Sequence, residues 1–261
     1  MTDLNGARVL VTRPAHQAEN LCRLIEQQGG VAVRLPTLEI VECDDLFAIQ
    51  KNLAHLESFQ WLIFVSVNAV NFALKANDGK IPRFKTQPTC AAIGKATANA
   101  LERAGVVVDL TPEPPYNSEA LLAMPELQHV QGQRVLIVRG EGGREELANT
   151  LQSRGADVHY LNVYKRIMPR MNNAEIILLL EQNQLDVITA TSGEVLQNLL
   201  IMLDATRHQQ LFNLPLVVVS DRIKQMATEL GFKRIAVASS PSDEAILETV
   251  NQSNRGIAWP N

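Results

Sequence analysis

Hydroxyl, glycine and basic residues follow the short apolar runs of this sequence, at positions where they could bind a negatively charged ligand. In an open parallel sheet, ligands bind at the carboxyl ends of the strands, where helix N-termini present unpaired N–H groups. Residues of these types at the expected strand ends are therefore candidates for binding. They are Arg13, Ser66, Asn68, Gly94, Lys95, Thr97, Arg139, Gly140, Gly142, Arg144, Ser192, Gly193, Ser220 and Arg222. Such a set favours an anionic organic ligand that carries carboxylate or phosphate groups.

The serines in this set have a second interpretation. Ser66, Ser192 and Ser220 each stand where a helix is expected to begin. Serine is a favoured N-cap because its hydroxyl accepts a backbone N–H of the first turn. A cap at the open edge of a sheet also faces the ligand, so both roles stay open for these residues.

Motifs for a bound cofactor or metal are missing from the sequence. The loop RGEGGRE at 139–145 has Glu145 where a GxGxxG dinucleotide fingerprint needs glycine, and no GxxxxGK[ST] loop occurs. The five histidines are scattered, and the three cysteines lie far apart without CxxC spacing. We expect neither a cofactor nor a metal, and no disulfide.

The composition is that of an ordinary globular protein. Of 261 residues, 46% are hydrophobic and 20% are charged, and no apolar run approaches the roughly 20 residues that span a bilayer. The formal charge is −4 and no run of Lys or Arg occurs, so nucleic acid is not an expected partner. The first ten residues contain Asp3 and no long apolar stretch. The sequence therefore predicts a cytoplasmic protein without a membrane span.

The elements that carry the candidate residues occur twice, because the chain contains an internal repeat. RVLVTRPAHQAENLCRLIEQQGGVAVRL, from Arg8, aligns without a gap with RVLIVRGEGGREELANTLQSRGADVHYL, from Arg134, at an offset of 126 residues. The same offset matches FQWLIFVSVNAV at 59–70 with LDVITATSGEVL at 185–196, and IGKATANALERAG at 93–105 with VSDRIKQMATELG at 219–231. The chain is therefore two copies of one unit.

Each copy alternates short β-branched runs with amphipathic segments of helical period. Strands are expected at 9–11, 31–35, 61–65, 89–93 and 106–110 in the first copy, and at 135–138, 157–161, 187–191, 216–219 and 234–238 in the second. Continuous apolar strands separated by helices are typical of parallel sheets covered on both faces. The sequence predicts an α/β protein with two doubly wound, flavodoxin-like parallel-sheet domains.

Two stretches interrupt this alternation, PTLEIVECD at 36–44 and NVYKRIMPRM at 162–171. They are related by the same repeat offset, contain Pro36 and Pro169, and are too polar on one side to be central strands. We interpret them as a pair of extended linkers.

Seven motifs then occur in a definite order along the chain. They are RVLVTRP, FVSVNAV, AAIGKATANALERAG, NSEALL at 117–122, VLIVRGEGGREEL, VYKR at 163–166 and TATSGEVL. Their order and spacing resemble the uroporphyrinogen-III synthase family along nearly the whole chain. The resemblance implies an enzyme of haem biosynthesis, a cyclising hydro-lyase that uses no metal or cofactor. Its substrate would be the linear tetrapyrrole hydroxymethylbilane, cyclised to uroporphyrinogen III with inversion of ring D and loss of water.

The resemblance also implies that the domains are not the two repeats. In the family the two linkers pair as a two-stranded antiparallel hinge, here 36–44 and 161–171. One α/β domain would then be discontinuous, comprising residues 1–35 and 172–261, and the other would comprise residues 45–160. The substrate would lie in the cleft between them.

Tyr164, in the second linker, matches the tyrosine that the family implicates in the loss of water. The hydroxymethyl group must leave as water and give an azafulvene cation, and a phenol would hydrogen-bond the departing oxygen rather than protonate it fully. A hinge tyrosine bonded to backbone is the alternative interpretation of Tyr164. The substrate's carboxylates would be held by local donors, since the net charge of the chain is −4.

The match departs from the family at 219–223. Relatives show an IGxxTA-like segment in the C-terminal copy, as residues 93–98 do in the first copy, whereas this chain has VSDRI. Ser220 or Arg222 would have to substitute for the hydroxyl expected there. Asn68 lies at a position that varies among relatives.

A second hypothesis comes from another class of protein, a non-catalytic two-domain sensor or binding protein that closes on an anionic organic ligand. Such sensors usually carry a signal peptide or a DNA-binding head, and neither is expected from this sequence. The enzyme hypothesis further implies a monomer in transient contact with the preceding pathway enzyme, which supplies hydroxymethylbilane.

Overall fold

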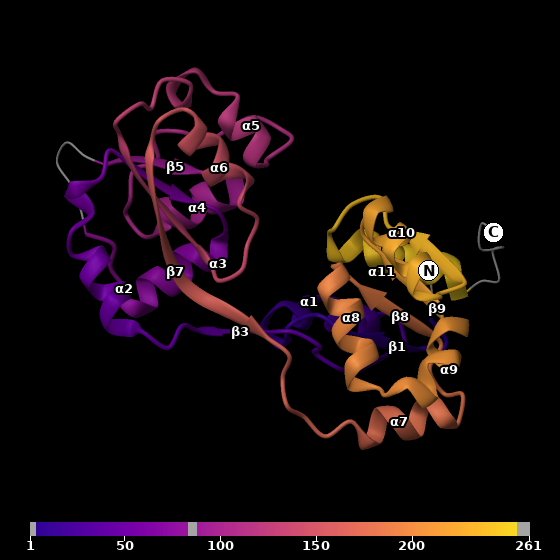
Figure 1. Cartoon of the computed structure of the whole chain (residues 1–261). Helices are drawn as coiled ribbons and strands as arrows, with labels where there is room; N and C mark the ends of the chain where they lie inside the picture. Colours follow the sequence, from indigo (N-terminus) through magenta and orange to yellow (C-terminus); the bar gives the residue numbers. More distant parts are fainter. Residues whose placement is uncertain (1–3, 83–87, 255–261) are drawn as a thin grey trace. The chain divides into compact units, whose positions relative to one another are not determined.

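The structure is a computed structural model, and it describes residues 4–82 and 88–254. These residues form two compact units that are interleaved in the sequence. Unit 1 joins the chain up to Glu39 to the chain from Ile167 onward, and unit 2 is the continuous segment Ile40–Arg166. Each unit contains one five-stranded sheet with helices on both faces (Figure 1).

Unit 2 contains the sheet with the strand order β3-β7-β6-β4-β5. Its strands are β3 (Glu39–Glu42), β4 (Trp61–Phe64), β5 (Thr89–Ala92), β6 (Arg134–Gly140) and β7 (Asp157–Ile167). Its helices are α2 (Leu46–Leu53), α3 (Val67–Ala76), α4 (Lys95–Arg103), α5 (Ser118–Leu122) and α6 (Glu146–Ser153), with short turns η1 (Leu56–Ser58) and η2 (Pro125–Leu127). Helices α2, α3 and α4 pack on one face of the sheet, and α5 and α6 pack on the other.

Unit 1 contains the sheet with the strand order β10-β9-β8-β1-β2. Its strands are β1 (Arg8–Val11), β2 (Val31–Arg34), β8 (Val187–Ala190), β9 (Pro215–Val218) and β10 (Arg234–Val237). Its helices are α1 (Ala15–Gln27), α7 (Ala174–Glu181), α8 (Gly193–Met202), α9 (His208–Asn213), α10 (Asp221–Leu230) and α11 (Asp243–Asn254), with the short turn η3 (Ala205–Arg207). Helices α1 and α11 cover one face, and α7, α8 and α10 cover the other. None of the helices in the described ranges is long and apolar enough to cross a membrane.

Each sheet is built from both copies of the repeat. In unit 1, β1 and β2 of the first copy join β8, β9 and β10 of the second through the parallel pairing of β1 with β8. In unit 2, β6 and β7 of the second copy join β4 and β5 of the first through the parallel pairing of β6 with β4. Figure 1 shows the exchange as indigo β1 beside orange β8. The predicted fold class, α/β with two doubly wound parallel sheets, is confirmed.

Local sequence explains why these segments adopt their structures. All four residues of β4 are buried, because helices cover both faces of its sheet. Helix α1 buries Ala18, Leu21 and Ile25, which recur at helical spacing on one face. The helix ends before Gly29, whose positive φ of 71° is easy for glycine and strained for other residues.

The strand expected at 106–110 does not form as a regular strand. Its described contact with the sheet is a single parallel bridge between Ala91 and Leu110. The carboxylate of Asp109 accepts the backbone N–H of Cys90 at 2.8 Å, and so occupies a donor that a regular ladder would use. The side chain of Val107 is left 77% exposed. The prediction of a strand was therefore wrong here, because the side chain of Asp109 competes with backbone pairing.

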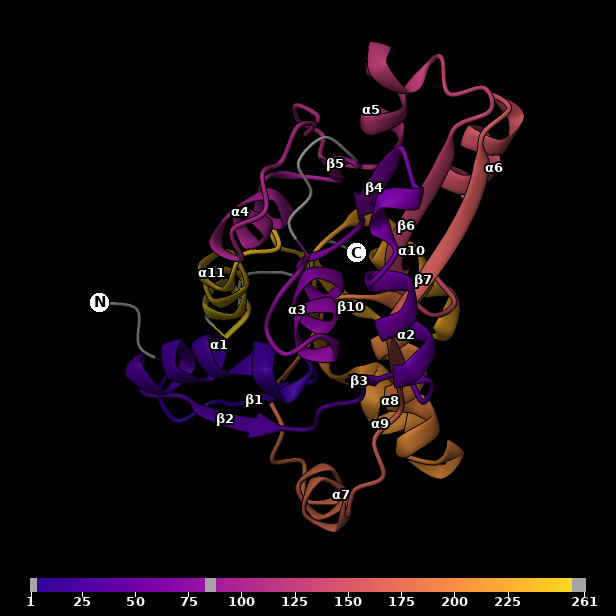
Figure 2. The ribbon, with the colours of Figure 1, turned by 90° about the vertical axis from the view of Figure 1, so that its left-hand side faces the viewer.

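Strand β7 is longer than the sequence pattern indicated. A strand was expected at 157–161 and a linker at 162–171, but β7 continues without a break to Ile167 and has β3 as its neighbour (Figure 2). Its register against β6 shifts by one residue, because Arg139 is opposite Asn162 whereas the next residue, Gly140, is opposite Tyr164. Strand β7 therefore holds one additional residue, a β-bulge.

The pairing of β4 with β6 predicts how fragments of the chain fold. A fragment of residues 39–167 keeps every strand of the unit 2 sheet, so it should unfold in one cooperative thermal transition, followed by circular dichroism. Fragments 1–126 and 127–261 separate β4 from β6 and β1 from β8, so they should show no sharp transition. Sharp transitions in both of these fragments, with none in 39–167, would contradict the exchanged arrangement.

Candidate active site

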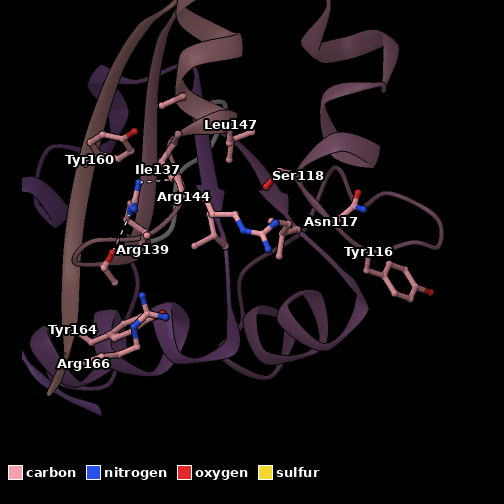
Figure 3. A pocket seen from close by; sticks show the side chains of 15 residues that line it. Tyr116, Asn117, Ser118, Ile137, Arg139, Arg144, Leu147, Tyr160, Tyr164 and Arg166 are labelled. Carbon is pink, nitrogen blue, oxygen red and sulfur yellow. Dashed lines mark hydrogen bonds between the residues drawn. The ribbon is translucent and has the colours of Figure 1, made fainter. Parts of the chain in front are cut away.

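A pocket of about 340 Å³ lies at the carboxyl ends of β4, β5 and β6 in unit 2 (Figure 3). Val65 follows β4, Ile93 follows β5, and Arg139 and Gly140 end β6. Strands β4 and β6 are the neighbours from which the chain continues in opposite directions across the sheet, and open sheets bind ligands at such a switch point. Ligand pockets span roughly 300–1000 Å³. This pocket is therefore the candidate active site.

Arg139 places a buried positive charge at this pocket. The residue is 6% exposed, and its guanidinium donates to the carbonyl oxygens of Gly140 and Arg144, each at 3.1 Å. The guanidinium also stacks on Tyr160, with Cζ at 4.6 Å from the ring centroid. Gly143 leaves room for it, because a Cβ at that position would collide with the guanidinium.

The buried charge of Arg139 is not paired with a carboxylate in the described part of the chain. Among residues 4–82 and 88–254, no carboxylate forms an ion pair with this guanidinium. Arginine has more N–H donors than its two carbonyl bonds use, and these suit a carboxylate. A ligand carboxylate would therefore compensate a charge that the described residues leave uncompensated.

Tyr164 packs at the same strand end. The residue is 7% exposed, and its ring lies over Gly140 so closely that a Cβ on Gly140 would collide with it. Val163 and Tyr164 both belong to the core cluster beneath α3, although consecutive strand residues normally point to opposite faces. The bulge in β7 accounts for this, because it breaks the alternation at these residues.

Ser66 contacts Tyr164 and also caps a helix. Its Oγ accepts the backbone N–H of Ala69 at 3.0 Å, which caps α3. The same Oγ lies 3.3 Å from the phenol oxygen of Tyr164. The helix start, the serine and the tyrosine are thus connected by hydrogen bonds at the edge of the pocket.

The start of α5 and the two residues before it form another side of the pocket. Tyr116, Asn117 and Ser118 line it, and Figure 3 shows them across the pocket from Tyr160. Asn117 caps α5 by accepting the backbone N–H of Ala120 at 2.8 Å. Hydroxyl, amide and guanidinium groups therefore surround the pocket, and these groups can bind a carboxylate.

The counterpart of Arg139 in unit 1 is Arg13, and its surroundings differ. The guanidinium of Arg13 is paired with the carboxylate of Asp243, the first residue of α11. Asn20 donates to the other carboxylate oxygen of Asp243 at 2.7 Å. The positive charge of Arg13 is therefore neutralised within unit 1.

A comparison of helices α5 and α11 shows the substitution behind this difference. They begin with matching segments, NSEALL at 117–122 and SDEAIL at 242–247. Asn117 and Ser242 occupy equivalent positions, since each accepts the N–H of the residue three places later. The next residue is Ser118 in unit 2 and Asp243 in unit 1. A serine thus stands at the pocket where the other copy has a carboxylate.

Comparison with known proteins identifies relatives of this chain. Residues 19–248 match the family model described as uroporphyrinogen-III synthase HemD. The chain belongs to this family. It is 36% identical over 246 residues to the uroporphyrinogen-III synthase of Escherichia coli (strain K12), an alignment that covers 93% of this chain and 99% of the relative. It is 35% identical over 245 residues to that of Salmonella typhimurium (strain LT2), with the same coverage.

Solved structures of uroporphyrinogen-III synthases have a similar fold. A mutant of the Thermus thermophilus protein superposes with a TM-score of 0.67 at 16% identity, covering 96% of this chain and 99% of that one. The Helicobacter pylori 26695 protein gives a TM-score of 0.56 at 18% identity, covering 93% and 97%. At these identities the likeness concerns the fold. The family predicted from the order of the motifs is confirmed.

Several residues predicted for a uroporphyrinogen-III synthase site meet at the unit 2 pocket. Tyr164, Arg139, Gly140 and Arg144 line it. Ser66 is not a lining residue, but its Oγ lies 3.3 Å from the phenol oxygen of Tyr164, which lines the pocket. Gly94 packs against Tyr116, which lines the pocket, and a Cβ on Gly94 would lie 2.8 Å from the Cβ of Tyr116.

Other predicted residues of unit 2 lie elsewhere in the structure. Thr97 is 4% exposed in α4, so its side chain belongs to the interior. Asn68 is half-buried in the first turn of α3, and Lys95 is exposed at the start of α4. Gly142 is exposed, with a positive φ of 68°. None of these four is among the residues that line the described pocket.

Most of the predicted residues of unit 1 have structural roles. Besides the paired Arg13, Ser192 and Ser220 cap α8 and α10, accepting backbone N–H groups at 3.2 and 3.4 Å. Gly193 lies against Met226 with no room for a Cβ, and Arg222 is exposed on α10. Capping is thus confirmed for both serines, whereas contact of these residues with a ligand stays a prediction.

Sequence reasoning missed Tyr160, Ser118 and Gly143. Tyr160 lies on β7 within a stretch expected to be an ordinary strand, and nothing local indicates that an arginine stacks on it. Ser118 could have been found by comparing NSEALL with SDEAIL in the two copies. The role of Gly143 depends on the position of the Arg139 side chain, which the sequence does not reveal.

Metal ligands and titratable groups add little at this pocket. Within the described ranges, no group of three or more His, Cys, Asp or Glu side chains could hold a metal ion. Lys165, next to Tyr164 in sequence, is bonded to Asp44 at 2.6 Å, and this hydrogen bond raises the pKa of Lys165. Lys165 therefore stays positively charged near neutral pH, bound to Asp44.

The close packing of Tyr164 on Gly140 predicts the effect of Gly140→Ala. The added methyl group should force the ring to move and lower the free energy of unfolding by about 1–3 kcal/mol, measured by urea denaturation. In a Tyr164→Ala background the same substitution should cost much less, because the ring is gone. Equal costs in the two backgrounds would show that the tyrosine ring is not what requires glycine here.

Proposed function

We propose that this protein is an enzyme that cyclises hydroxymethylbilane to uroporphyrinogen III in haem biosynthesis, inverting ring D and releasing water. Membership of the uroporphyrinogen-III synthase family supports this activity, as do the relatives of that name at 36% and 35% identity. The alternative, a non-catalytic sensor of an anionic ligand, is not favoured, because these relatives are named as synthases.

The observation that carries the assignment to this pocket is the charge of Arg139, which the described residues leave without a carboxylate partner, in a pocket that Tyr164 also lines. The substrate is a polycarboxylate, whereas the protein has a net charge of −4, so overall attraction does not draw the two together. Binding must therefore rely on local donors. Arg139 and Arg144 supply charged donors, and Ser118 and Asn117 supply neutral ones.

The volume of the pocket indicates how much of the substrate it holds. At about 340 Å³ it lies near the lower end of the range for small-molecule sites. It suits one pyrrole ring with its acid side chains rather than a whole tetrapyrrole. The proposal is that Arg139 holds a carboxylate of the reacting part of the chain, so that its leaving oxygen comes within reach of Tyr164.

Tyr164 would act on the departing hydroxyl group. The bond between the hydroxymethyl carbon and its oxygen breaks, the ring nitrogen stabilises the resulting azafulvene cation, and negative charge develops on the oxygen. A hydrogen bond from the phenol of Tyr164 to that oxygen strengthens as the charge develops, and so lowers the barrier.

Ring closure completes the proposed reaction. The substituted carbon of the terminal ring attacks the cation, and the resulting spiro intermediate fragments and recloses with ring D inverted. A proton is lost as the ring system regains aromaticity, which balances the proton that leaves with water. The substrate supplies all atoms of the product, so the cycle requires no cofactor.

Three finer proposals accompany the reaction. We propose that the protein works in the cytoplasm, as a monomer, and in transient contact with the enzyme that supplies hydroxymethylbilane.

The first test is the identity of the product. Purified protein in the presence of a metal chelator should convert hydroxymethylbilane to the type III isomer, resolved by chromatography after oxidation. Heat-denatured protein is the control and should leave only the isomer formed without inversion. If the native protein yields type I alone, the proposed function is wrong, and if activity is lost only when chelator is present, the metal-free reaction is wrong.

The second test is Tyr164→Phe, which removes one hydroxyl and keeps the ring that packs on Gly140. A hydrogen bond to an oxygen that becomes charged contributes about 1–3 kcal/mol, so kcat should fall roughly 5- to 150-fold. Thermal stability should change little, because the ring contacts remain. Turnover at the wild-type rate would exclude Tyr164 from the loss of water.

A further inference from the structure

Ser66 differs from the other serine caps in its second contact. Ser66, Ser192 and Ser220 each accept the N–H at the start of a ten-residue helix. Ser66 Oγ also lies 3.3 Å from the phenol oxygen of Tyr164. In the described part of the chain, Ser192 and Ser220 have no such tyrosine partner. Ser66 therefore has a hydrogen-bond partner outside the helix that it caps.

Either oxygen of this contact can be the donor. Ser66 Oγ accepts the N–H of Ala69, and a hydroxyl can accept a second hydrogen bond as well as donate one. The N-terminus of α3 carries partial positive charge, which polarises the Ser66 hydroxyl and makes it the better donor. With Ser66 as the donor and the phenol oxygen of Tyr164 as the acceptor, the phenol proton is left for another acceptor.

We propose that Ser66 is a positioning residue that acts through Tyr164: it donates its hydroxyl proton to the phenol oxygen and so directs the phenol proton toward the leaving oxygen of the substrate. The order of donation is Ala69 N–H to Ser66, Ser66 O–H to Tyr164, and Tyr164 O–H to the substrate. Each of these three hydrogen bonds becomes stronger as charge develops on the leaving oxygen. Ser66 itself touches no reacting atom.

The ring of Tyr164 is held in place by its neighbours. Its ring is held by Gly140 below and by Phe72, whose centroid is 5.6 Å away with the rings tilted by 36°. Tyr164 lines the pocket shown in Figure 3, and its phenol oxygen also lies 3.3 Å from Ser66 Oγ. With the ring fixed, the direction of the phenol proton depends on which neighbour accepts it.

The test compares Ser66→Ala with a matched loss of a helix cap. Asp45 caps α2 in the same unit, accepting the N–H of Ala48 at 2.8 Å, and does not contact the pocket. Both Ser66→Ala and Asp45→Ala should lower the melting temperature, because each removes a cap. We expect only Ser66→Ala to lower kcat, by about 2- to 10-fold with KM unchanged, since one neutral hydrogen bond is lost. Ser66→Thr keeps the hydroxyl and should restore most of kcat.

A double-mutant cycle tests whether Ser66 acts through Tyr164. In a Tyr164→Phe background, Ser66→Ala should have no further effect on kcat, because the acceptor oxygen is gone. The inference is overturned if Ser66→Ala lowers kcat equally in both backgrounds, or if Asp45→Ala lowers kcat as much as Ser66→Ala does. An unchanged kcat in Ser66→Ala also overturns it.

A second readout is independent of turnover and separates this inference from the proposed function on which it rests. In protein labelled with ¹³C-tyrosine, the Cζ resonance of Tyr164 is assigned by its loss in Tyr164→Phe. It should shift in Ser66→Ala and stay in place in Asp45→Ala, because Cζ reports hydrogen bonding at the phenol oxygen. An unmoved resonance overturns the inference. Type I product from the wild-type protein contradicts the proposed function instead, whatever the resonance does.

Discussion

The parallel pairing of β4 with β6 is the constraint on which the rest of the site depends. Trp61 through Phe64 of β4 pair in register with Val135 through Val138 of β6. After β4 the chain continues to β5 on one side, and after β6 it continues to β7 on the other side. The loops that follow β4 and β6 therefore lie next to each other at the carboxyl edge of the sheet. Ser66 lies just after β4, and Arg139 is the last residue but one of β6. Residues more than 70 positions apart in sequence are brought to one pocket by this single pairing.

Strand β7, next to β6, brings Tyr164 to the same pocket through a β-bulge. The bulge in β7 sets Tyr164 opposite Gly140 and turns it into the core beside Val163. A regular register would have placed Val163 opposite Gly140 instead. Glycine at position 140 is then required by the closeness of the tyrosine ring and not by its backbone conformation. A local extra residue thus determines where the phenol meets Ser66.

The internal repeat allows the two copies of the framework to be compared within one molecule. Both copies keep an arginine after the first strand of the repeat, Arg13 and Arg139. In unit 1 the arginine is held by Asp243, and in unit 2 the described residues offer it no carboxylate. The arginine of unit 1 therefore forms an ion pair within the protein, whereas we propose that the arginine of unit 2 binds an anionic ligand. The two units have kept one fold while their electrostatics have diverged.

Much of the fold could be predicted from the sequence, because the repeat and the apolar runs identify the strands and the parallel sheets. The exchange of strands could not be derived from these patterns, since β1 has the same local sequence whichever copy it joins. Asp109 shows a second limit, because a single side chain bonded to Cys90 disrupts a strand of suitable composition. Of the residues that line the candidate pocket, Arg139 was expected from its place at a strand end and Tyr164 from the family resemblance. Tyr160 and Gly143 could not, because their roles depend on where one arginine side chain lies.

The central claim is that the uncompensated charge of Arg139 binds a substrate carboxylate, and Ser118→Asp tests it most directly. This substitution gives unit 2 the residue that neutralises Arg13 in unit 1, at the first position of a helix, where an acidic side chain is favourable. Steady-state kinetics should show KM raised roughly 10-fold or more, since the introduced carboxylate competes for Arg139 and repels the substrate. The melting temperature should not fall, and neutral Ser118→Asn should keep KM near the wild-type value. A KM for Ser118→Asp equal to that of the wild type would contradict the claim.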